Sequence, residues 1–548
     1  MVERRAGMLL LALLLALPVA AHAAPGGTDV AAPAAAGMPA PAAATGSTAL
    51  RQAISTFIAR PRFASARWGI DVVDLTSGRT LYAHDAGKLF VPASNAKLFT
   101  AALAMDLLGP ATRFTTTLYA GDHADGHGVV QGDLILAGGG DPALGTETGD
   151  TDGTDGTDWA DTLAARLVAA GITHVNGNLV VDDTLFRDPP FGDGWGAGDL
   201  LTDYAPQVGA LTVREGTIRV SVSRDGPRCC KVAVQPESAG VRVRNLSVDA
   251  TPGDDSSLLL YRPLGYDTLY VTGSLPRGVH MREYTLAAPD PARMAGQDLL
   301  DALDRAGVTL SGRLRVLHWP QSSPLPRYPH RVRIATLHSP PLAQLLRHML
   351  LRSDNLYAQT LLLQVGRYWQ QSGAGSCGWV LHWTSQWGLC AMRTLLARIG
   401  INREQAHFTE GSGLSRQDMV SPRATTTLLA WIARQPWAAD LIDALPHSGR
   451  NGTLLYRLRE LPQGDRVQAK TGTLAHMYTL SGFLETQDGR HLAFSLMLNN
   501  YQRPIRPDGD WAPPDPTQDL DAIVRILAAR GATEMAATAA DATPPASR

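Results

Sequence analysis

PASNAKLFT, residues 92–100, is the stretch that decides the fold of this 548-residue chain. Pro92 stands where the first turn of a helix accepts a proline, and apolar residues then follow at helical spacing as far as Leu108. Ser94 and Lys97 therefore lie in the first turns of the predicted helix, on the same face. A serine hydroxyl is a weak nucleophile until a neighbouring base takes its proton, so this pair predicts an activated serine.

The sequence on both sides of this helix also has regular patterns. Before it we expect a helix at 50–58 and a hairpin of strands at 68–73 and 80–83. Far downstream, helical spacing returns at 341–365 and 422–432, and strand-like runs follow at 466–474, 479–485 and 492–498. Because the chain starts and finishes with adjacent strands, the fold class we expect is an α/β domain formed from both chain ends.

Between these two halves, short alternating runs separated by Gly, Asp and Pro extend to about Val316. We therefore expect a large mostly-β insertion at 116–334, within an α/β domain made of 49–115 and 335–528. Inside the insertion, Thr146–Asp158 repeats Thr, Asp and Gly, but the acidic spacing does not match a calcium-binding EF-hand loop. We interpret that repeat as a surface insertion.

The two ends of the chain differ in composition from the rest. Two arginines, an apolar run and a small-x-small site predict a signal peptide at 1–23, and hence export to the periplasm or the outside of the cell envelope. Residues 24–48, rich in Ala, Pro and Gly, predict a disordered linker, and 529–548 a disordered tail. The apolar run is shorter than the roughly 20 residues that span a bilayer. We expect no integral membrane anchor.

Charge and cysteine usage exclude several classes of protein. A net charge of −2 offers no electrostatic attraction to nucleic acid. The four cysteines form neither a CxxC pair nor a Cys/His cluster with zinc spacing, so we expect no metal. After export, Cys377 and Cys390 either form a disulfide or leave Cys377 a buried free thiol, whereas adjacent Cys229 and Cys230 can bond only with strain. Without GxSxG or HExxH, histidine-triad hydrolases and zinc peptidases have no support.

Two further motifs accompany Ser94 and Lys97, namely Ser353-Asp-Asn355 and Lys470-Thr-Gly472. Burial and the positive charge of Lys470 would lower the pKa of Lys97 and allow it to act as a base. Ser353 can relay a proton to the leaving amine, and Asn355 can hold Lys97 and a substrate amide by hydrogen bonds.

The strand with the third motif, Thr471, Gly472 and Thr473, is predicted to bind substrate. Gly472 lets a substrate backbone lie close to the strand edge. The N–H groups of Thr473 and Ser94 can then face a developing oxyanion.

Together with RSDNLYAQ at 352–359, GSGLSR at 411–416 and AKTGTL at 469–474, these motifs resemble the class C low-molecular-mass penicillin-binding proteins, the D-alanyl-D-alanine carboxypeptidase and endopeptidase family. Family-like sequence runs from about residue 50 to 499 and includes GGGDPAL, VVDDTLF and DYAPQVGAL in the insertion. The resemblance implies a β-lactamase/transpeptidase-like serine domain with a long insertion between its first two motifs.

The resemblance also implies a Ser94 acyl-enzyme formed on peptidoglycan stem peptides, with β-lactams as covalent inhibitors and no cofactor. The family's pocket for the substrate's diamino-acid side chain falls on Asp182, Phe186 and Arg416, where Asp182 would pair the amine and Arg416 the carboxylate. A purely structural role is the alternative for Asp182 and Phe186.

Three questions about function stay open at this point. A β-lactamase on the same fold is one alternative, which the long insertion disfavours. A non-catalytic wall-binding relative is another, although no motif residue is missing. Trimming of terminal D-alanine and cleavage of cross-links both present a D-alanyl carbonyl to the same serine, so the residues do not separate them.

Overall fold

A computed structural model describes most of the chain. The described residues are 48–146, 158–225, 228–250, 257–276, 278–373, 377, 381–461, 467–503, 505 and 513–529. The expected signal peptide, nearly all of the expected linker and tail, and residues 147–157 of the Thr-Asp-Gly repeat lie outside them. Across these described segments, no helix combines the length and apolar character needed to cross a membrane.

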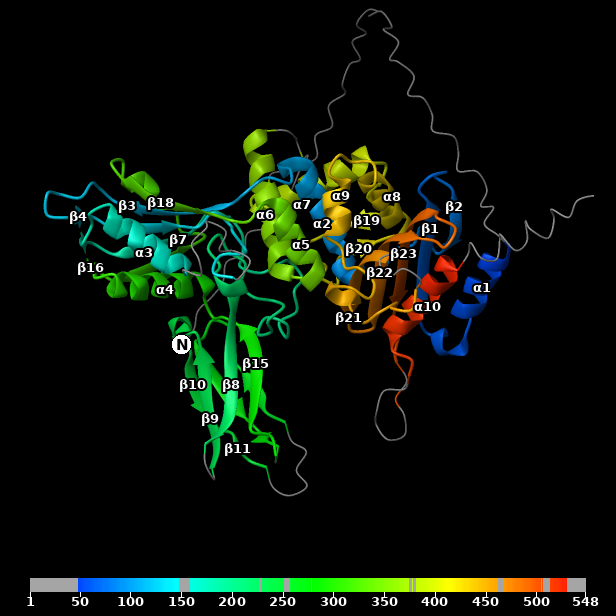
Figure 1. The fold of residues 1–548 in the computed structure, drawn as a ribbon, viewed down its shortest axis with the longest axis horizontal. Coiled ribbons are helices and arrows are strands. Elements are labelled where there is room, and N and C mark those ends of the chain that lie inside the picture. Colours follow the sequence, from blue (N-terminus) through cyan, green and yellow to red (C-terminus); the bar gives the residue numbers. More distant parts are fainter. Residues whose placement is uncertain are drawn as a thin grey trace, which may run out of the picture. The chain divides into compact units, whose positions relative to one another are not determined.

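A five-stranded antiparallel sheet carries strands from both ends of the described chain. Its order is β2 (Thr80–His84), β1 (Arg67–Asp74), β23 (His491–Asn499), β22 (Met477–Glu485) and β21 (Val467–Leu474). Strands β1 and β2 form the expected hairpin, and β1 pairs with β23 along its whole length. Figure 1 shows β1 in blue beside β23 in orange. Strand β21, which carries the Lys-Thr-Gly motif, is an edge strand.

Both faces of this sheet are buried, which explains the continuous apolar run of β23. On one face, Phe494 and Leu496 pack with helices α1 (Thr48–Ile58) and α10 (Pro516–Ala528). On the other face, Met497 packs against a helical layer. That layer contains α2 (Ala96–Leu108), α5 (Leu342–Arg352), α6 (Asn355–Ser372), α7 (Thr384–Arg398), α8 (Pro422–Ile432) and α9 (Ala438–Asp443).

The helical pattern expected at 341–365 is interrupted in the structure. Helix α5 ends at Arg352, and the residue that caps it, Ser353, has left-handed backbone angles (φ 61°, ψ 36°). Helix α6 then begins with Asp354 as its N-cap, whose side chain accepts a hydrogen bond of 3.0 Å from the N–H of Tyr357. The Ser-Asp-Asn motif is therefore the corner between two helices.

The region between α2 and α5 contains a second five-stranded sheet. Its order is β17 (Leu314–His318), β7 (Leu179–Asp183), β5 (Leu134–Ala137), β3 (Thr115–Ala120) and β18 (Val332–His338). Helices α3 (Trp159–Ala169) and α4 (Pro291–Arg305) share its hydrophobic core. The region that the sequence led us to expect as mostly β-structure therefore also contains two helices. These helices form because their apolar residues recur at helical spacing and cover the sheet.

The other described strands form smaller sheets, most of them in this region. Their strands are β4 (Val129–Gln131), β6 (His174–Asn176) and β16 (Thr309–Leu310); β8 (Thr217–Asp225), β9 (Arg228–Gln235) and β15 (Met281–Ala287); β10 (Arg242–Asn245), β12 (Leu259–Tyr261) and β13 (Thr268–Thr272); and the pairs β11 (Val248–Asp249) with β14 (Ser274–Leu275) and β19 (Ala406–His407) with β20 (Met419–Val420).

Helix α6 is joined to this region by buried hydrogen bonds. The side-chain amide of Gln364 donates to the carbonyls of Gly139 and Gly140, at 2.6 and 3.0 Å. Gly140 has φ +75°, and a Cβ there would collide with Gln364 and with the ring of Phe186. The glycine run of GGGDPAL thus allows the backbone to approach α6 closely.

All four cysteines are paired. Cys377 is bonded to Cys390, and Cys229 to Cys230. For Cys377, the structure favours the disulfide over the free thiol.

Strand β23 provides a test of this core. Replacing the fully buried Leu496 with alanine removes side-chain contacts on the α1–α10 face and leaves a cavity, so we expect the free energy of unfolding to fall by about 2–5 kcal/mol. Leu259→Ala is the matched control, because that leucine is 62% exposed and its loss should cost less than about 0.5 kcal/mol. Urea denaturation of the two variants would measure both, and equal midpoints would contradict this account of the core.

Candidate active site

Ser94 lies in a short 3-10 turn, Ala93–Asn95, that runs directly into α2. The turn is tied to the main sheet, because Thr479 Oγ1 donates to the carbonyl of Pro92 at 2.9 Å and Asn95 Nδ2 donates to Ser481 Oγ at 2.7 Å. A Cβ on Gly472 would lie 3.0 Å from the backbone nitrogen of Ser94 and would collide with Thr479. Glycine at this position therefore lets β21 pack against the serine turn.

Lys97 is fully buried, and its ammonium group has three acceptors. Nζ lies 3.0 Å from Ser94 Oγ, 2.5 Å from Asn355 Oδ1 and 2.8 Å from the carbonyl oxygen of Ser412. The lysine therefore contacts the serine as the helical spacing predicts. It is also held by two groups that are distant in the sequence.

Burial lowers the pKa of Lys97 to about 8, because the charged form loses its hydration. The negative charges of Glu410, Asp354 and Asp418 act in the opposite direction and keep the value from falling further. An amine with this pKa can exist in either protonation state near neutral pH, as a catalytic base must.

Lys470 is also fully buried, on β21. Its Nζ donates to Ser353 Oγ and to the carbonyl of Thr471, both at 2.8 Å. Burial, followed by the positive charge of Lys97, holds the pKa of Lys470 well below its usual range. The two buried ammonium groups repel each other, and this repulsion adds to burial in lowering the pKa of Lys470.

Asn355 connects this site to the region between α2 and α5. Its Oδ1 accepts from Lys97, and its Nδ2 donates to the backbone carbonyl of Tyr204 at 2.8 Å. The amide is therefore oriented by partners on both sides.

The remaining residues of the third motif lie along the edge strand β21. Thr471 is buried and donates a hydrogen bond of 2.7 Å to Thr453 Oγ1, whereas Thr473 is exposed. In the sheet, β21 has a strand partner on one side only. On its other side, the segment 446–448 pairs with the first residues of β21, through Ser448 N–H to the carbonyl of Val467 and Ala469 N–H to the carbonyl of Pro446. An extended ligand could therefore pair only with the later part of the strand, which carries Thr471 and Thr473.

The three residues expected to form a side-chain pocket have different surroundings. Asp182 is buried, and both of its carboxylate oxygens already accept hydrogen bonds, from Thr184 and Ser323. Phe186 is buried in a cluster with Leu356 and other apolar side chains, next to the Asn355 end of α6. Arg416 is exposed. Within the described segments, no hydrogen bond or ion pair joins these residues to the Ser94–Lys97 group.

The loop at 411–416 supplies contacts that the sequence analysis missed. Glu410 is buried, and its carboxylate accepts from the N–H groups of Ser412 and Gly413, at 2.6 and 2.5 Å. Burial and the charge of Glu410 raise the pKa of neighbouring Asp418 well above its usual range. This acidic pair orients the loop whose Ser412 carbonyl holds Lys97. The GSGLSR motif locates the loop in the sequence. It does not predict the contact with Lys97, because that contact is made by a backbone carbonyl, which every residue has.

The arrangement of these groups defines a class of enzyme. A buried lysine hydrogen-bonds to a serine hydroxyl at the start of a helix, and a second lysine–serine pair interacts with it electrostatically. This is the constellation of a serine acyl-transfer enzyme in which lysine is the base.

Comparisons with known proteins agree with this class. The D-Ala-D-Ala carboxypeptidase 3 (S13) family profile matches residues 50–512. A D-alanyl-D-alanine carboxypeptidase of Actinomadura sp. is 31% identical over 479 residues, which are 83% of this chain and 82% of that protein. The DacB carboxypeptidase of Haemophilus influenzae is 26% identical over 439 residues, 79% of this chain and 85% of that protein. The structure of penicillin-binding protein 4 from Haemophilus influenzae superposes with a TM-score of 0.72 at 24% identity, covering 86% and 98% of the two chains.

The chain therefore belongs to the D-Ala-D-Ala carboxypeptidase 3 (S13) family. It is a serine peptidase that acts on peptidoglycan, and its mixed α/β fold is that of a transpeptidase-like serine domain. The family and the function expected from the sequence are confirmed.

The pKa of Lys97 predicts how acylation depends on pH. If Lys97 acts as the base in its neutral form, which is the form present above the pKa, the rate of acylation by a fluorescent penicillin should rise with pH and level off above about 8. Below that pH, we expect about a tenfold change in rate per pH unit. Stopped-flow fluorescence from pH 5 to 10 would record this profile. The arginine variant Lys97→Arg stays protonated and should be slow throughout, and a flat wild-type profile would rule out Lys97 as the base.

Proposed function

We propose that this chain is a serine-type D-alanyl-D-alanine carboxypeptidase and endopeptidase that works through an acyl-enzyme on Ser94. The observation that carries the proposal is the buried Nζ of Lys97, which lies within hydrogen-bond distance of both Ser94 Oγ and Asn355 Oδ1. Neutral Lys97 takes the hydroxyl proton while Ser94 Oγ bonds to the D-alanyl carbonyl carbon. The N–H groups of Ser94 and Thr473 receive the oxyanion.

Collapse of this intermediate requires a proton on the leaving amine. Ser353 relays that proton, and Lys470, 2.8 Å from its hydroxyl, replaces it. The C–N bond breaks, and an ester on Ser94 remains until water hydrolyses it. The leaving group is free D-alanine when a stem peptide is trimmed, and the amine of a neighbouring stem peptide when a cross-link is cut.

We further propose that the catalytic domain consists of residues 49–115 and 335–528, formed from both chain ends, and that 116–334 is its insertion. The pairing of β1 with β23, and of β3 with β18 at the two expected boundaries, supports this division. Residues 1–23 would direct export, and the mature enzyme would act in the periplasm or outside the cell envelope, next to its substrate.

A β-lactamase is the alternative on the same fold, and the surroundings of Glu410 argue against it. Rapid hydrolysis of a penicilloyl ester needs a base that positions water, a role that a glutamate fills in class A β-lactamases. Glu410 acts electrostatically on Lys97, but its carboxylate accepts hydrogen bonds from the backbone of its own loop. We infer that this buried carboxylate, already occupied by backbone hydrogen bonds, is not the base that positions water, and that β-lactams act as covalent inhibitors.

Benzylpenicillin tests both the nucleophile and the fate of the ester. Intact-protein mass spectrometry should detect one adduct per chain, on the peptide that contains Ser94, lasting minutes or longer. A deacylation that is slower by three powers of ten requires only about 4 kcal/mol of lost transition-state stabilisation.

The serine variant provides the control. Ser94→Ala should form no adduct, and it should neither release D-alanine from muropeptides nor cut their cross-links, while circular dichroism shows an intact fold. Rapid turnover of excess penicillin without an adduct would indicate a β-lactamase, and near-normal hydrolysis by Ser94→Ala would exclude this serine as the nucleophile.

For the substrate's side chain, we propose that Arg416 binds a carboxylate, since it is exposed beside the 411–415 loop that holds Lys97. Asp182 would pair the amine of the same side chain only by giving up its hydrogen bonds with Thr184 and Ser323. Phe186 would support the wall of the pocket.

Arg416→Ala tests this specificity. The loss of a charge-assisted hydrogen bond should lower kcat/KM by roughly tenfold to a hundredfold on muropeptides with a diamino-acid carboxylate, and much less on a minimal D-Ala-D-Ala peptide. Arg434→Ala, at another exposed arginine, is the matched control. Equal losses on the two substrates would assign Arg416 a structural role.

A further inference from the structure

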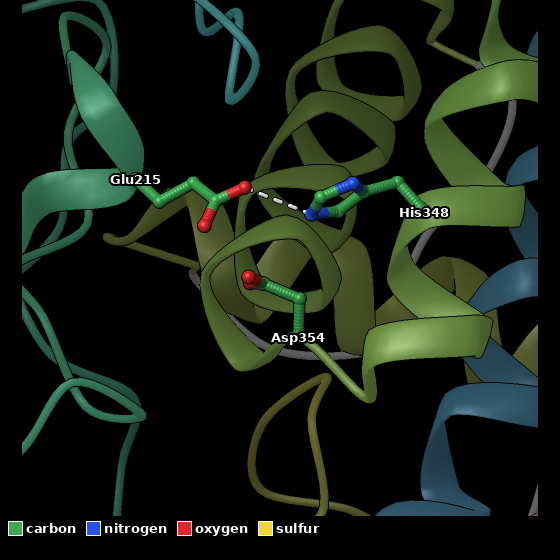
Figure 2. Close-up of side chains that lie close together, drawn as sticks. All are labelled: Glu215, His348 and Asp354. Atoms are coloured by element: carbon green, nitrogen blue, oxygen red, sulfur yellow. Dashed lines mark ion pairs between the residues drawn. The ribbon is translucent and has the colours of Figure 1, made fainter. Parts of the chain in front are cut away.

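Three potential metal ligands converge behind the Ser-Asp-Asn corner. They are Glu215, His348 and Asp354, and their ligand atoms all lie within 4.8 Å of one another. Figure 2 shows the side chains approaching from three different elements: the turn at 214–216, helix α5 and the start of α6. None of the three has a part in the catalytic steps described above.

The histidine is positioned as a ligand would be. Its Nε2 atom is buried and makes no hydrogen bond of good geometry, although Glu215 Oε1 is 2.9 Å away. The imidazole ring is stacked on Tyr357, with ring centroids 4.5 Å apart and an angle of 21° between the planes. This stacking fixes the direction in which Nε2 points.

The two carboxylates leave an excess of negative charge around one imidazole. Asp354 is partly buried and caps α6 with one oxygen, and its carboxylate lies near His348 and Glu215 (Figure 2). Glu215 is held there by its backbone, because three successive residues of its turn have positive φ values, 50°, 55° and 64°. Two carboxylates gathered in a partly buried site are stabilised by a nearby cation, which a bound metal ion would supply.

We propose that Glu215, His348 and Asp354 form a binding site for a divalent transition-metal ion of the zinc type. Imidazole nitrogen and carboxylate oxygen bind zinc at about 2.0–2.2 Å, so ligands on the same ion lie about 3–3.5 Å apart. The Nε2–Oε1 distance of 2.9 Å is close to this spacing, and a shift of the partly exposed Glu215 side chain can shorten the longer separations. Three protein ligands leave further coordination positions for water.

A second histidine with two acidic neighbours shows which feature matters. His318 places Nδ1 2.8 Å from Asp183 and Nε2 3.3 Å from Asp290. Its two carboxylates therefore bind opposite nitrogens of the ring, and no single ion can contact all three residues. In the Glu215 cluster, by contrast, a single nitrogen faces both carboxylates (Figure 2).

Metal binding would have a defined structural effect. Glu215 follows β7 and precedes β8, whereas Asp354 stands between the active-site residues Ser353 and Asn355. An ion shared by these ligands would clamp the 214–216 turn to the corner that positions both catalytic side chains. Its role would be structural, since none of its ligands contacts Ser94 or Lys97.

Zinc binding to the whole mature chain tests the site. The protein, prepared without a polyhistidine tag and stripped with EDTA, is titrated with Zn²⁺ by calorimetry, and native mass spectrometry gives the stoichiometry. We expect one ion per chain and a rise in melting temperature with added zinc. His348→Ala and Glu215→Gln should each weaken binding tenfold or more, since even the loss of a residue that only supports a ligand costs about that much.

His318→Ala is the matched control and should bind zinc like the wild type. Stoichiometric acylation by benzylpenicillin verifies that each variant is folded. If His348→Ala does not fold, the test depends on the zinc affinity of Glu215→Gln, which is nearly isosteric with the wild type. Absence of zinc binding by the wild type at about 0.1 mM free ion would overturn the proposal. Unchanged affinity in the folded Glu215→Gln variant would overturn it as well.

Discussion

Two ammonium groups, those of Lys97 and Lys470, are buried without exposed surface, and most of the catalytic architecture follows from the need to satisfy them. A buried charge is costly unless hydrogen bonds and neighbouring charges replace its hydration. Lys97 finds acceptors in its own turn, in α6 and in the loop at 411–416. Lys470 finds one at the corner between α5 and α6. The same contacts that satisfy the lysines bring the three motifs together, and the incomplete compensation lowers both pKa values.

The region between α2 and α5 takes part in this arrangement. The carbonyl of Tyr204 accepts a hydrogen bond from Asn355, and Phe186 packs in the cluster that contains Leu356. Gln364, deeper along α6, holds the glycine run of the second sheet. The helix that carries Asn355 is thus held from both sides. Such support can keep the Asn355 amide and the Lys97 amine in place during the acylation that we propose for Ser94.

Local patterns in the sequence predicted the local structure well. The helix expected at 422–432 has the same bounds as α8, and the strands expected at 479–485 and 492–498 lie within β22 and β23. The break at Ser353 was not predicted, because the helical spacing of apolar residues continues through it. In the structure Ser353 has left-handed backbone angles, and its hydroxyl accepts a hydrogen bond from Lys470. Helix α4 was missed although Ala295, Leu299 and Leu303 recur every four residues, because strand-like runs surround it.

The sequence by itself determined the chemistry of the protein: a serine and a lysine on one helical face, two further motifs and the family that they indicate. These features can be recognised from the sequence alone, because each motif is short and its chemistry depends directly on the types of its residues. Only the tertiary structure decided which groups complete the site. The Ser412 carbonyl beside Lys97 is backbone, which every residue possesses, and Glu215, His348 and Asp354 meet only because a turn before β8 packs against the corner of α5 and α6. Contacts of this kind depend on the packing of distant segments, and so no pattern of neighbouring residues encodes them.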